Sequence, residues 1–234
     1  MTKGEGGRLR ARMVTGAADL ARALALRSLV FRGGAAEDRD SFDARCGQVV
    51  IENGEGQLLA TFRMLSLPEG EIESSYSAQF YDLAALRHYP GPVLELGRFC
   101  VAPGVGDPDV LRLAFGVITR AVDADGVTLL CGCSSFAGAD PARHAGGLAA
   151  LRDRTGPVQW RPRARREAVA FGTGAGDPAA LPPMLRSYLA LGAWVSDHAV
   201  QDTELDTLHV FTAIETNRIA PARARALRAL AQAV

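Results

Sequence analysis

The sequence predicts an α/β fold with a mixed central sheet, a bulged central strand and helices on both faces of the sheet. Residues 93–101 are rich in strand formers but contain a glycine, which often marks a bulge. A capped helix and a second apolar strand follow, over residues 108–125 and 127–136. Strand, helix and strand of these lengths form a right-handed crossover between parallel strands, and a hairpin signal in residues 48–67 adds antiparallel strands.

The chain opens with a predicted strand and a predicted helix. In residues 9–14 apolar positions alternate with arginines, so one face of that strand is expected to meet water. Residues 17–31 carry an apolar stripe that includes Leu24 and Phe31, and Arg27 lies in line with it. An arginine in this position either snorkels toward the helix end or takes part in binding.

A loop rich in charge follows, over residues 33–44. It places Asp38, Asp40 and Asp43 around Phe42. Three carboxylates here either hold a cationic substrate or belong to a solvated loop with local caps.

The hairpin predicted for residues 48–67 turns at Asn53 and Gly54, which accept positive φ angles. Its second strand carries Arg63 on a face that is otherwise mainly apolar. A short helix is expected near residues 81–88.

The central strand carries two charges, Glu95 and Arg98, which are costly inside a core unless they are paired or used. Positions three apart face opposite ways in a regular strand, so the two side chains share a face only if the ladder is interrupted between them. Gly97 lies at that point, and a bulge there would open a cleft with a carboxylate and a guanidinium. The alternative is a structural ion pair at a strand edge.

The second half of the chain gives weaker signals. A helix broken by two glycines is expected over residues 140–152, and its His144 is expected at the surface. A strand over residues 165–171, a helix over residues 183–191 and a strand over residues 208–214 follow. We predict an N-terminal tail over 1–7, a single domain over 8–219 and an arginine, alanine and leucine helix over 220–234.

Composition excludes several classes of protein. The chain has 234 residues, is 48% hydrophobic and has a formal net charge of zero, which fits a globular protein with a sizeable core. It contains no run of eighteen apolar residues and no apolar secretion signal near its start, so we expect a cytoplasmic protein. No metal site is expected, because the cysteines form no paired CxxC motif and have no nearby histidines. These are Cys46, Cys100, Cys131 and Cys133.

Positive charge is concentrated in one segment. Between Arg143 and Arg166 lie seven arginines and one acidic residue, Asp153. Such a patch favours a polyanionic partner, whether nucleic acid, an anionic lipid surface or an acidic protein, and the alternative is a solvated surface. Nucleic acid is disfavoured because few aromatic residues other than Trp160 are interleaved with the arginines.

The order of elements resembles the GNAT acyltransferase fold. The motifs ELGRFCV at residues 95–101, GCSSFAGADPARHA at 132–145, DRDSFD at 38–43 and LPPMLRSYLALGA at 181–193 resemble the ornithine N-acyltransferases of bacterial aminolipid synthesis. That family transfers a 3-hydroxyacyl chain from acyl carrier protein to the α-amine of an amino acid. A more distant similarity to the acyl-homoserine lactone synthases runs through the same charged positions.

The resemblance implies roles for particular residues. Glu95 would be the base that takes a proton from the amine, with Arg98 beside it, and backbone amides near Cys100 and Val101 would stabilise the oxyanion. Residues implied in binding the acceptor are Arg27, Phe31, Asp40, Asp43 and Arg63. The acyl-donor cleft would include Ser134, Ser135 and Phe136.

The donor implied is acyl carrier protein, with no bound cofactor. The family's usual phosphate loop reads PGVGDPDV here, and Asp107 and Asp109 would repel the pyrophosphate of coenzyme A. The single phosphate of a carrier's phosphopantetheine, and the carrier's acidic surface, suit the basic segment better. The arginines expected to dock the carrier are Arg152, Arg154, Arg161, Arg163, Arg165 and Arg166.

Two other functions stay open at this point. The first is an acyl-homoserine lactone synthase that uses S-adenosylmethionine, and the second is a non-catalytic protein that binds acyl carrier protein or a membrane. The segment after Phe31 is shorter than in the family, so the acceptor is open between ornithine, glutamine and other amino acids. The resemblance also suggests peripheral contact with the inner membrane.

Overall fold

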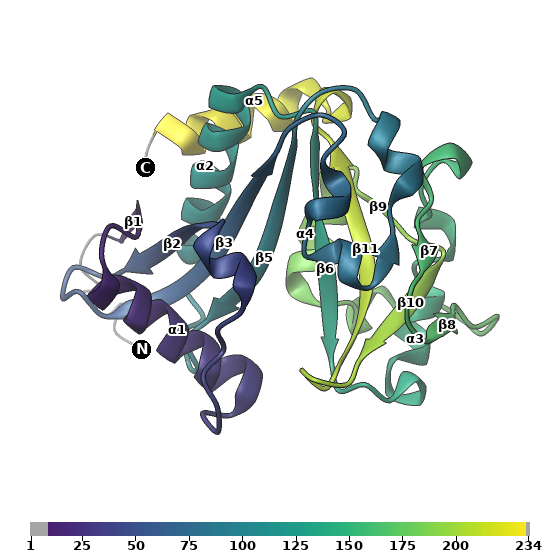
Figure 1. Ribbon diagram of the computed structural model, residues 1–234, viewed down its shortest axis with the longest axis horizontal. Coiled ribbons are helices and arrows are strands. Elements are labelled where there is room, and N and C mark those ends of the chain that lie inside the picture. Colours follow the sequence, from purple (N-terminus) through teal and green to yellow (C-terminus); the bar gives the residue numbers. More distant parts are fainter. Residues whose placement is uncertain (1–8, 233–234) are drawn as a thin grey trace. The chain divides into compact units, whose positions relative to one another are not determined.

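The computed structural model describes residues 9–232, so the tail predicted over 1–7 lies outside the described residues. The α/β class is confirmed (Figure 1). The chain divides into two compact units, of which unit 1 comprises Met1–Leu65, Leu96–Asp125 and Pro221–Val234, and unit 2 comprises Ser66–Glu95 and Gly126–Ala220. The prediction of a single domain over residues 8–219 stays a prediction.

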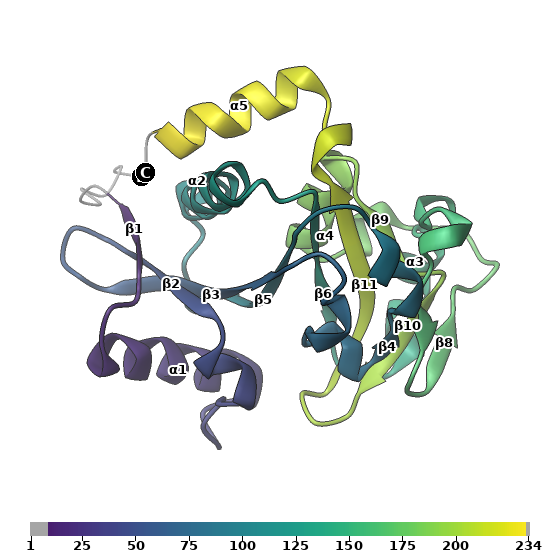
Figure 2. The ribbon, with the colours of Figure 1, turned by 45° about the horizontal axis from the view of Figure 1, so that its top comes forward.

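Unit 1 is a sheet with helices on both faces. Strands β1 (Arg10–Met13), β2 (Gly47–Glu52) and β3 (Leu58–Leu67) pair as antiparallel neighbours, and β3 is also hydrogen-bonded to β5 (Val93–Val101). Helix α1 (Ala17–Arg32) lies on one face of these strands. Helices α2 (Pro108–Asp125) and α5 (Pro221–Gln232) lie on the other and pack against each other (Figure 2).

The predicted hairpin and helix of unit 1 form, but the positive φ of the hairpin turn lies at Gly56, not at Asn53 or Gly54. Asn53 Oδ1 accepts hydrogen bonds from the amides of Glu55 and Gln57, which closes the turn between β2 and β3. Asp107 Oδ1 accepts from the amide of Asp109, and this capping contact lies at the start of α2. The predicted hairpin and helix are therefore confirmed, and each follows from local side-chain chemistry.

Unit 2 is a mixed sheet in the order β5-β6-β11-β10-β8. Strand β6 (Leu129–Ala137) is parallel to β5, as the crossover predicts, and antiparallel to β11 (Thr207–Glu215). Strands β10 (His198–Asp202) and β8 (Ala168–Ala170) continue the sheet, and β9 (Trp194–Val195) pairs with β11.

A connecting segment of short turns lies in unit 2 before β5. It contains the 3₁₀ turns η2 (Ile72–Ser74), η3 (Ser77–Gln79) and η4 (Ala84–His88). Strand β4 (Tyr81–Asp82) lies between them and pairs with β7 (Arg163–Ala164). The helix expected near residues 81–88 is therefore not a single helix. The two-residue strand β4 is followed there by the 3₁₀ turn η4.

The weaker predictions for the second half are partly wrong. The helix expected over residues 140–152 is broken into η5 (Pro141–His144), α3 (Ala145–Ala149) and η6 (Arg152–Arg154). Of the strand expected over residues 165–171 only β8 forms, and β9 and β10 had no recognised signal. The helix expected over residues 183–191 is confirmed as α4 (Pro183–Ala190).

His144 is half-buried rather than free at the surface. Its Nε2 atom lies 2.9 Å from the carbonyl oxygen of Gly138, and its ring packs beside Phe136. Phe136 itself belongs to the core of unit 2. The buried members of that core are Phe136, Leu148, Leu151, Leu181, Leu185, Val195, Ala199, Leu208 and Val210.

The turn before β5 gives a first prediction. Gly91 has φ +88°, and a Cβ there would lie 2.6 Å from Cγ2 of Thr128, whereas Gly104 has φ +83° and a Cβ there would meet nothing within 4 Å. Alanine strains the backbone by about 1–2 kcal/mol at either site, and overpacking adds about 1–3 kcal/mol at Gly91 alone. We expect Gly91→Ala to lower the free energy of unfolding in urea by roughly 2–5 kcal/mol and Gly104→Ala by about 1–2 kcal/mol. Equal losses would show that Thr128 does not restrict this turn.

Candidate active site

Strand β5 carries both of the central charges, and its regular geometry ends between them. Its parallel pairing with β6 covers Val93 to Glu95, where Glu95 lies opposite Cys131. Arg98 has φ 53°, a left-handed conformation that is rare for a residue other than glycine. The interruption predicted at Gly97 therefore occurs one residue later.

The structure indicates another reason for glycine at position 97 than the predicted bulge. A Cβ at this position would lie 3.3 Å from Nε and 3.5 Å from Cγ of Arg63. Glycine here gives the Arg63 side chain room to pass across the strand.

Glu95 is held by donors from the turn that precedes β4. Its side chain is 3% exposed. Oε2 accepts a hydrogen bond from the Tyr76 amide at 2.7 Å, and Oε1 accepts from the Ser77 amide at 2.8 Å and from Ser77 Oγ at 2.6 Å. Three donors fill most of the acceptor capacity of an ionised carboxylate and fix its orientation.

Arg98 has its own partners within unit 1. Its Nε donates to Asp38 Oδ2 at 2.9 Å, and its Nη2 lies 3.5 Å from Asp40 Oδ2. The guanidinium carbon also lies 5.7 Å from the centre of the Phe31 ring, a cation–π contact. The predicted site residues Phe31 and Arg98 are thereby brought together.

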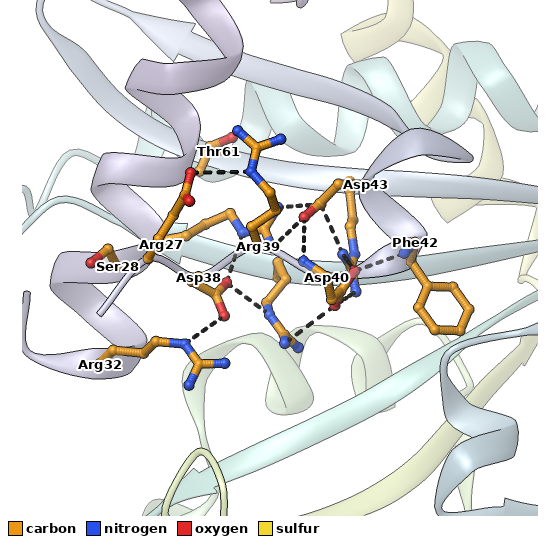
Figure 3. A network of polar contacts seen from close by, with 12 residues as sticks. Arg27, Ser28, Arg32, Asp38, Arg39, Asp40, Phe42, Asp43 and Thr61 are labelled. Atoms are coloured by element: carbon orange, nitrogen blue, oxygen red, sulfur yellow. Dashed lines mark hydrogen bonds and ion pairs between the residues drawn. The ribbon is translucent and has the colours of Figure 1, made fainter. Parts of the chain in front are cut away.

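Arg27 is the most deeply buried charge of unit 1. It is 0% exposed, which excludes snorkelling at the helix end. Its Nε donates to Asp38 Oδ2 at 2.8 Å and its Nη1 donates to Asp43 Oδ1 at 2.6 Å (Figure 3). Arg32 adds a bond from its Nε to Asp38 Oδ1 at 3.2 Å. Helix α1 is therefore tied to the loop that follows it through buried charge.

Arg63 completes this network from strand β3. It is 2% exposed and grips Asp40 with two bonds, from Nη1 to Oδ1 at 2.6 Å and from Nη2 to Oδ2 at 2.8 Å. Its Nη1 also donates to Asp43 Oδ1 at 2.9 Å. Asp40 caps the 3₁₀ turn η1 (Ser41–Ala44) by accepting from the Phe42 amide, and it keeps 25% of its side chain exposed. We name this set the arginine–aspartate network: Arg27, Arg32, Arg63, Arg98, Asp38, Asp40 and Asp43.

The loop over residues 33–44 is thus capped, as one interpretation expected, but it is not simply solvated. Asp38 and Asp43 are buried and paired. Burial alone would raise the pKa of Asp43, but bonds from Arg27 and the Asp40 amide, with the charges of Arg27 and Arg63, lower this pKa to about 2. At Asp38 burial also opposes ionisation, and the charges of Arg98 and Arg27 outweigh it, so this pKa is lowered too. Both carboxylates are therefore ionised at neutral pH.

The remaining predicted residues differ in their access to solvent. Ser135 is exposed, and Ser134 is half-buried with its Oγ accepting from Thr212 Oγ1 at 2.9 Å. Phe136 lies in the core of unit 2, apart from solvent. Cys100 is buried, and burial raises the pKa of its thiol to about 12, so it is protonated at neutral pH and not a nucleophile.

Three arginines of the basic segment are occupied by contacts within unit 2. Arg152 donates to the carbonyl oxygens of Gly172 and Gly174, each at 3.0 Å. Arg161 donates to Gly156 O at 2.7 Å, and Arg165 Nη2 lies 3.2 Å from Glu73 Oε1. Four arginines of the segment are exposed and have no ion pair with any described residue: Arg143, Arg154, Arg163 and Arg166.

Membrane-spanning helices and metal clusters are both missing from the described part of the chain. Within residues 9–232 no helix combines the length and the apolar content that a bilayer crossing requires. In the same residues no three histidine, cysteine, aspartate or glutamate side chains are grouped so that they could hold a metal ion.

Sequence reasoning found most charges of the site because each interrupts an apolar pattern. It considered Asp38 only as one of three loop carboxylates, and it did not predict that Asp38 joins three arginines. It missed Ser77, because a serine in the stretch at residues 74–77 breaks no pattern.

Comparison with known proteins defines the class. A family model described as an acetyltransferase (GNAT) domain matches residues 28–114. The fold is similar to that of FeeM, an N-acyl amino acid synthase from uncultured soil microbes, with 14% identity, a TM-score of 0.52 and coverage of 97% of this chain and 98% of FeeM. The CoA-dependent acyl-homoserine lactone synthase MesI gives 13% identity, a TM-score of 0.51 and coverage of 94% and 95%. The fold is that of the GNAT acyltransferases.

Sequence similarity narrows the class to a family. The L-ornithine N(alpha)-acyltransferase of Rhizobium meliloti (strain 1021) is 30% identical over 241 residues, which covers 90% of this chain and 81% of the relative. The enzyme of the same name from Brucella abortus (strain 2308) is 30% identical over 200 residues, covering 78% and 71%. The chain belongs to the L-ornithine N(alpha)-acyltransferase family and is an acyltransferase. The resemblance that the motifs indicated is confirmed.

The arginine–aspartate network gives the second prediction. Arg27→Met would leave the buried carboxylates of Asp38 and Asp43 without this partner, and breaking a buried pair costs about 3–5 kcal/mol. The matched control is Arg22→Met on the same helix, where the ion pair with Glu52 is partly exposed and contributes about 0–1 kcal/mol. Urea unfolding measures both. Similar losses for the two variants would contradict a structural role for Arg27.

Proposed function

We propose that this protein transfers a 3-hydroxyacyl chain from acyl carrier protein to the α-amine of an amino acid, with L-ornithine as the first candidate and glutamine as the second. The observation that carries the proposal is the similarity, over 90% of this chain, to a relative named L-ornithine N(alpha)-acyltransferase. FeeM, which shares the fold, is an N-acyl amino acid synthase, and this is consistent with the same type of reaction. The product would be a lipid-like N-acyl amino acid, which supports peripheral contact with the inner membrane from the cytoplasm.

Glu95 is the proposed base. An α-amine is mostly protonated near neutral pH, so a proton must leave before the nitrogen attacks the thioester. The burial and the fixed orientation of the Glu95 carboxylate support a role in proton transfer, either directly or through water. Arg98 is proposed to bind the carboxylate of the acceptor, because its planar fork suits a carboxylate.

Backbone amides of β5 are proposed to stabilise the oxyanion. The amide of Ala102 donates to Leu59 O on β3 at 2.8 Å. Because successive amides of a strand point to opposite sides, the amide of Val101 points away from β3 and that of Cys100 points toward it. Val101 is therefore the better oxyanion donor of the two.

The residues proposed for the acceptor fall into two groups. Asp40 and Phe31 keep partial exposure, so they are proposed to meet the acceptor, with Asp40 facing an ammonium group. Arg27, Asp43 and Arg63 are buried against their partners, so their proposed contribution is to hold Asp40 and Arg98 in place.

The charges at the start of α2 support a carrier protein as donor. Asp107 already accepts the Asp109 amide, and Asp109 pairs with Arg112 at 2.8 Å. Two carboxylates at this helix start disfavour the pyrophosphate of coenzyme A. No bound cofactor is proposed, and Ser134 and Ser135 are proposed to line the path of the donor, with Phe136 supporting them from the core.

A second candidate function comes from the same fold comparison. MesI is a CoA-dependent acyl-homoserine lactone synthase and shares the fold over nearly its whole length. A lactone made from S-adenosylmethionine is therefore the alternative product.

The third prediction tests the reaction. Purified protein is incubated with 3-hydroxyacyl carrier protein and an amino-acid mixture, and products are identified by mass spectrometry. We expect an N-acylated amino acid, and we expect Glu95→Gln to lower kcat by about 10²–10⁴-fold because general base catalysis contributes that much. Glu73→Gln is the matched control, since this carboxylate lies outside the proposed site and pairs with Arg165 and Arg87.

The other outcomes of this assay each select an alternative. A lactone formed after addition of S-adenosylmethionine would replace the proposal with the second candidate. Carrier binding without any product, and indifference to Glu95→Gln, would favour a non-catalytic binding protein.

The fourth prediction concerns carrier docking. Reversing the exposed charges in Arg163→Glu/Arg166→Glu should raise KM for the carrier about tenfold or more at low salt, with kcat little changed, because complementary charge steers association. The matched control is Arg10→Glu/Arg225→Glu, which reverses two exposed charges of unit 1. The difference between the two double variants should shrink as salt screens the charges. Equal KM values for the two double variants would show that the basic segment does not dock the carrier.

A further inference from the structure

Glu95 is connected to a thiol of strand β6 through one buried hydroxyl. Ser77 Oγ donates to Glu95 Oε1 at 2.6 Å, and Cys133 Sγ lies 3.4 Å from Ser77 Oγ as a donor to it. Ser77 is 0% exposed, so its hydroxyl has no direct contact with solvent. Thiol, hydroxyl and carboxylate thus form a chain in which each donor points toward Glu95.

The far end of this chain reaches the accessible part of β6. Leu129, Leu130 and Cys131 are buried where β6 pairs with β5, and the strand becomes partly exposed from Gly132 to Ser135. Cys133 is half-buried within that stretch. Of the three linked groups, the thiol is the one with the most access to a ligand.

The surrounding titratable groups stay neutral near pH 7. Burial raises the pKa of Cys131 well above its ordinary value, with Glu95 and Cys133 adding to the shift. Burial likewise raises the pKa of Tyr81, which interacts with Cys133, and burial lowers the pKa of His209, whose ring lies beside Tyr81, to about 4. Cys131, Tyr81 and His209 therefore carry no charge in this cluster near pH 7.

We propose that Cys133 is the acid that protonates the departing thiolate of the acyl donor, and that Ser77 relays a proton to it from Glu95. This inference rests on the proposed function, because it needs a thioester donor. An alkyl thiol such as a cysteine side chain and the alkyl thiol formed from the donor have similar acidity. Proton transfer between them therefore needs little driving force. Cys133 acts as a catalytic residue and Ser77 as a positioning residue in this scheme.

The protons and electrons balance over one turnover. Glu95 takes a proton from the acceptor ammonium, and the free amine forms the C–N bond at the thioester carbonyl. The C–S bond breaks with its electron pair on the donor sulfur, which takes the proton of Cys133. Ser77 then passes its proton to Cys133 and receives the one held by Glu95. The nitrogen loses its second proton to solvent, and all three side chains return to their starting states.

The test compares kcat and KM for 3-hydroxyacyl carrier protein and L-ornithine, or the acceptor that the product assay names. We expect Ser77→Ala and Cys133→Ala each to lower kcat about 10²-fold with KM within twofold. The matched controls, Ser75→Ala in the same turn and Cys131→Ala on the same strand, should stay within about threefold of the unmodified protein, because neither residue belongs to the relay. Thermal melting of every variant separates loss of catalysis from loss of folding.

Two conservative variants separate an acid from a merely structural group. Ser77→Thr keeps a hydroxyl and should recover at least tenfold of the kcat lost in Ser77→Ala. Cys133→Ser keeps a donor to Ser77 but is a far weaker acid, so its kcat should stay as low as that of Cys133→Ala. The kcat of the unmodified protein should also fall at alkaline pH as the Cys133 thiol ionises. The kcat of Cys133→Ala should show no such fall.

Each contrary result has a distinct meaning. An unmodified protein that transfers no acyl group overturns the proposed function, and the relay with it. An active protein in which Ser77→Ala and Cys133→Ala match their controls overturns the relay alone. Full recovery by Cys133→Ser, or a stable acyl adduct on Cys133 in intact-mass spectra without acceptor, also overturns the acid role.

Discussion

Pairing of buried charge is the constraint on which unit 1 depends. Removing a guanidinium from water costs several kcal/mol, and Arg27 meets that cost with the carboxylates of Asp38 and Asp43. The same carboxylates accept bonds from Arg98 and Arg63, which come from two strands. Buried ion pairs therefore hold four parts of unit 1 in one arrangement: helix α1, the loop over residues 33–44, β3 and the second half of β5. Moving any of them would leave a buried charge without its partner.

Unit 2 supports its buried carboxylate by another route. Within that unit Glu95 receives two backbone amides and one hydroxyl, all neutral donors. A carboxylate bound tightly to a guanidinium is a weak base, because the positive charge favours its ionised form. Hydrogen bonds from neutral donors also favour the ionised form of a carboxylate, and they fix its orientation. The aspartates of unit 1 are thus held by ion pairs, and the Glu95 carboxylate of unit 2 is held by hydrogen bonds from the turn before β4.

The sequence alone indicates those site residues that interrupt an apolar stripe or strand. Arg27, Arg63 and Glu95 stand out because each charge interrupts an apolar stripe or strand, and the hairpin and α2 follow from local turn and cap chemistry. Partners are not encoded in this way: Asp38 joins three arginines, and its contact with Arg98 spans 60 residues of sequence. The interruption of the strand was expected at Gly97, since glycine adopts unusual conformations at little cost, but the left-handed conformation lies at Arg98, whose side chain is bound by Asp38.

The short strands β9 and β10 show the same limit, because their pairing with β11 depends on tertiary context rather than on local pattern. Ser77 is a stronger case. Nothing in its neighbourhood distinguishes it from Ser74 or Ser75, and only its burial against Glu95 and Cys133 gives it a chemical role. A hydroxyl becomes part of a proton path through what it touches, so such residues emerge from coordinates and not from composition. Ser77 therefore could not be identified as a candidate from the sequence pattern alone.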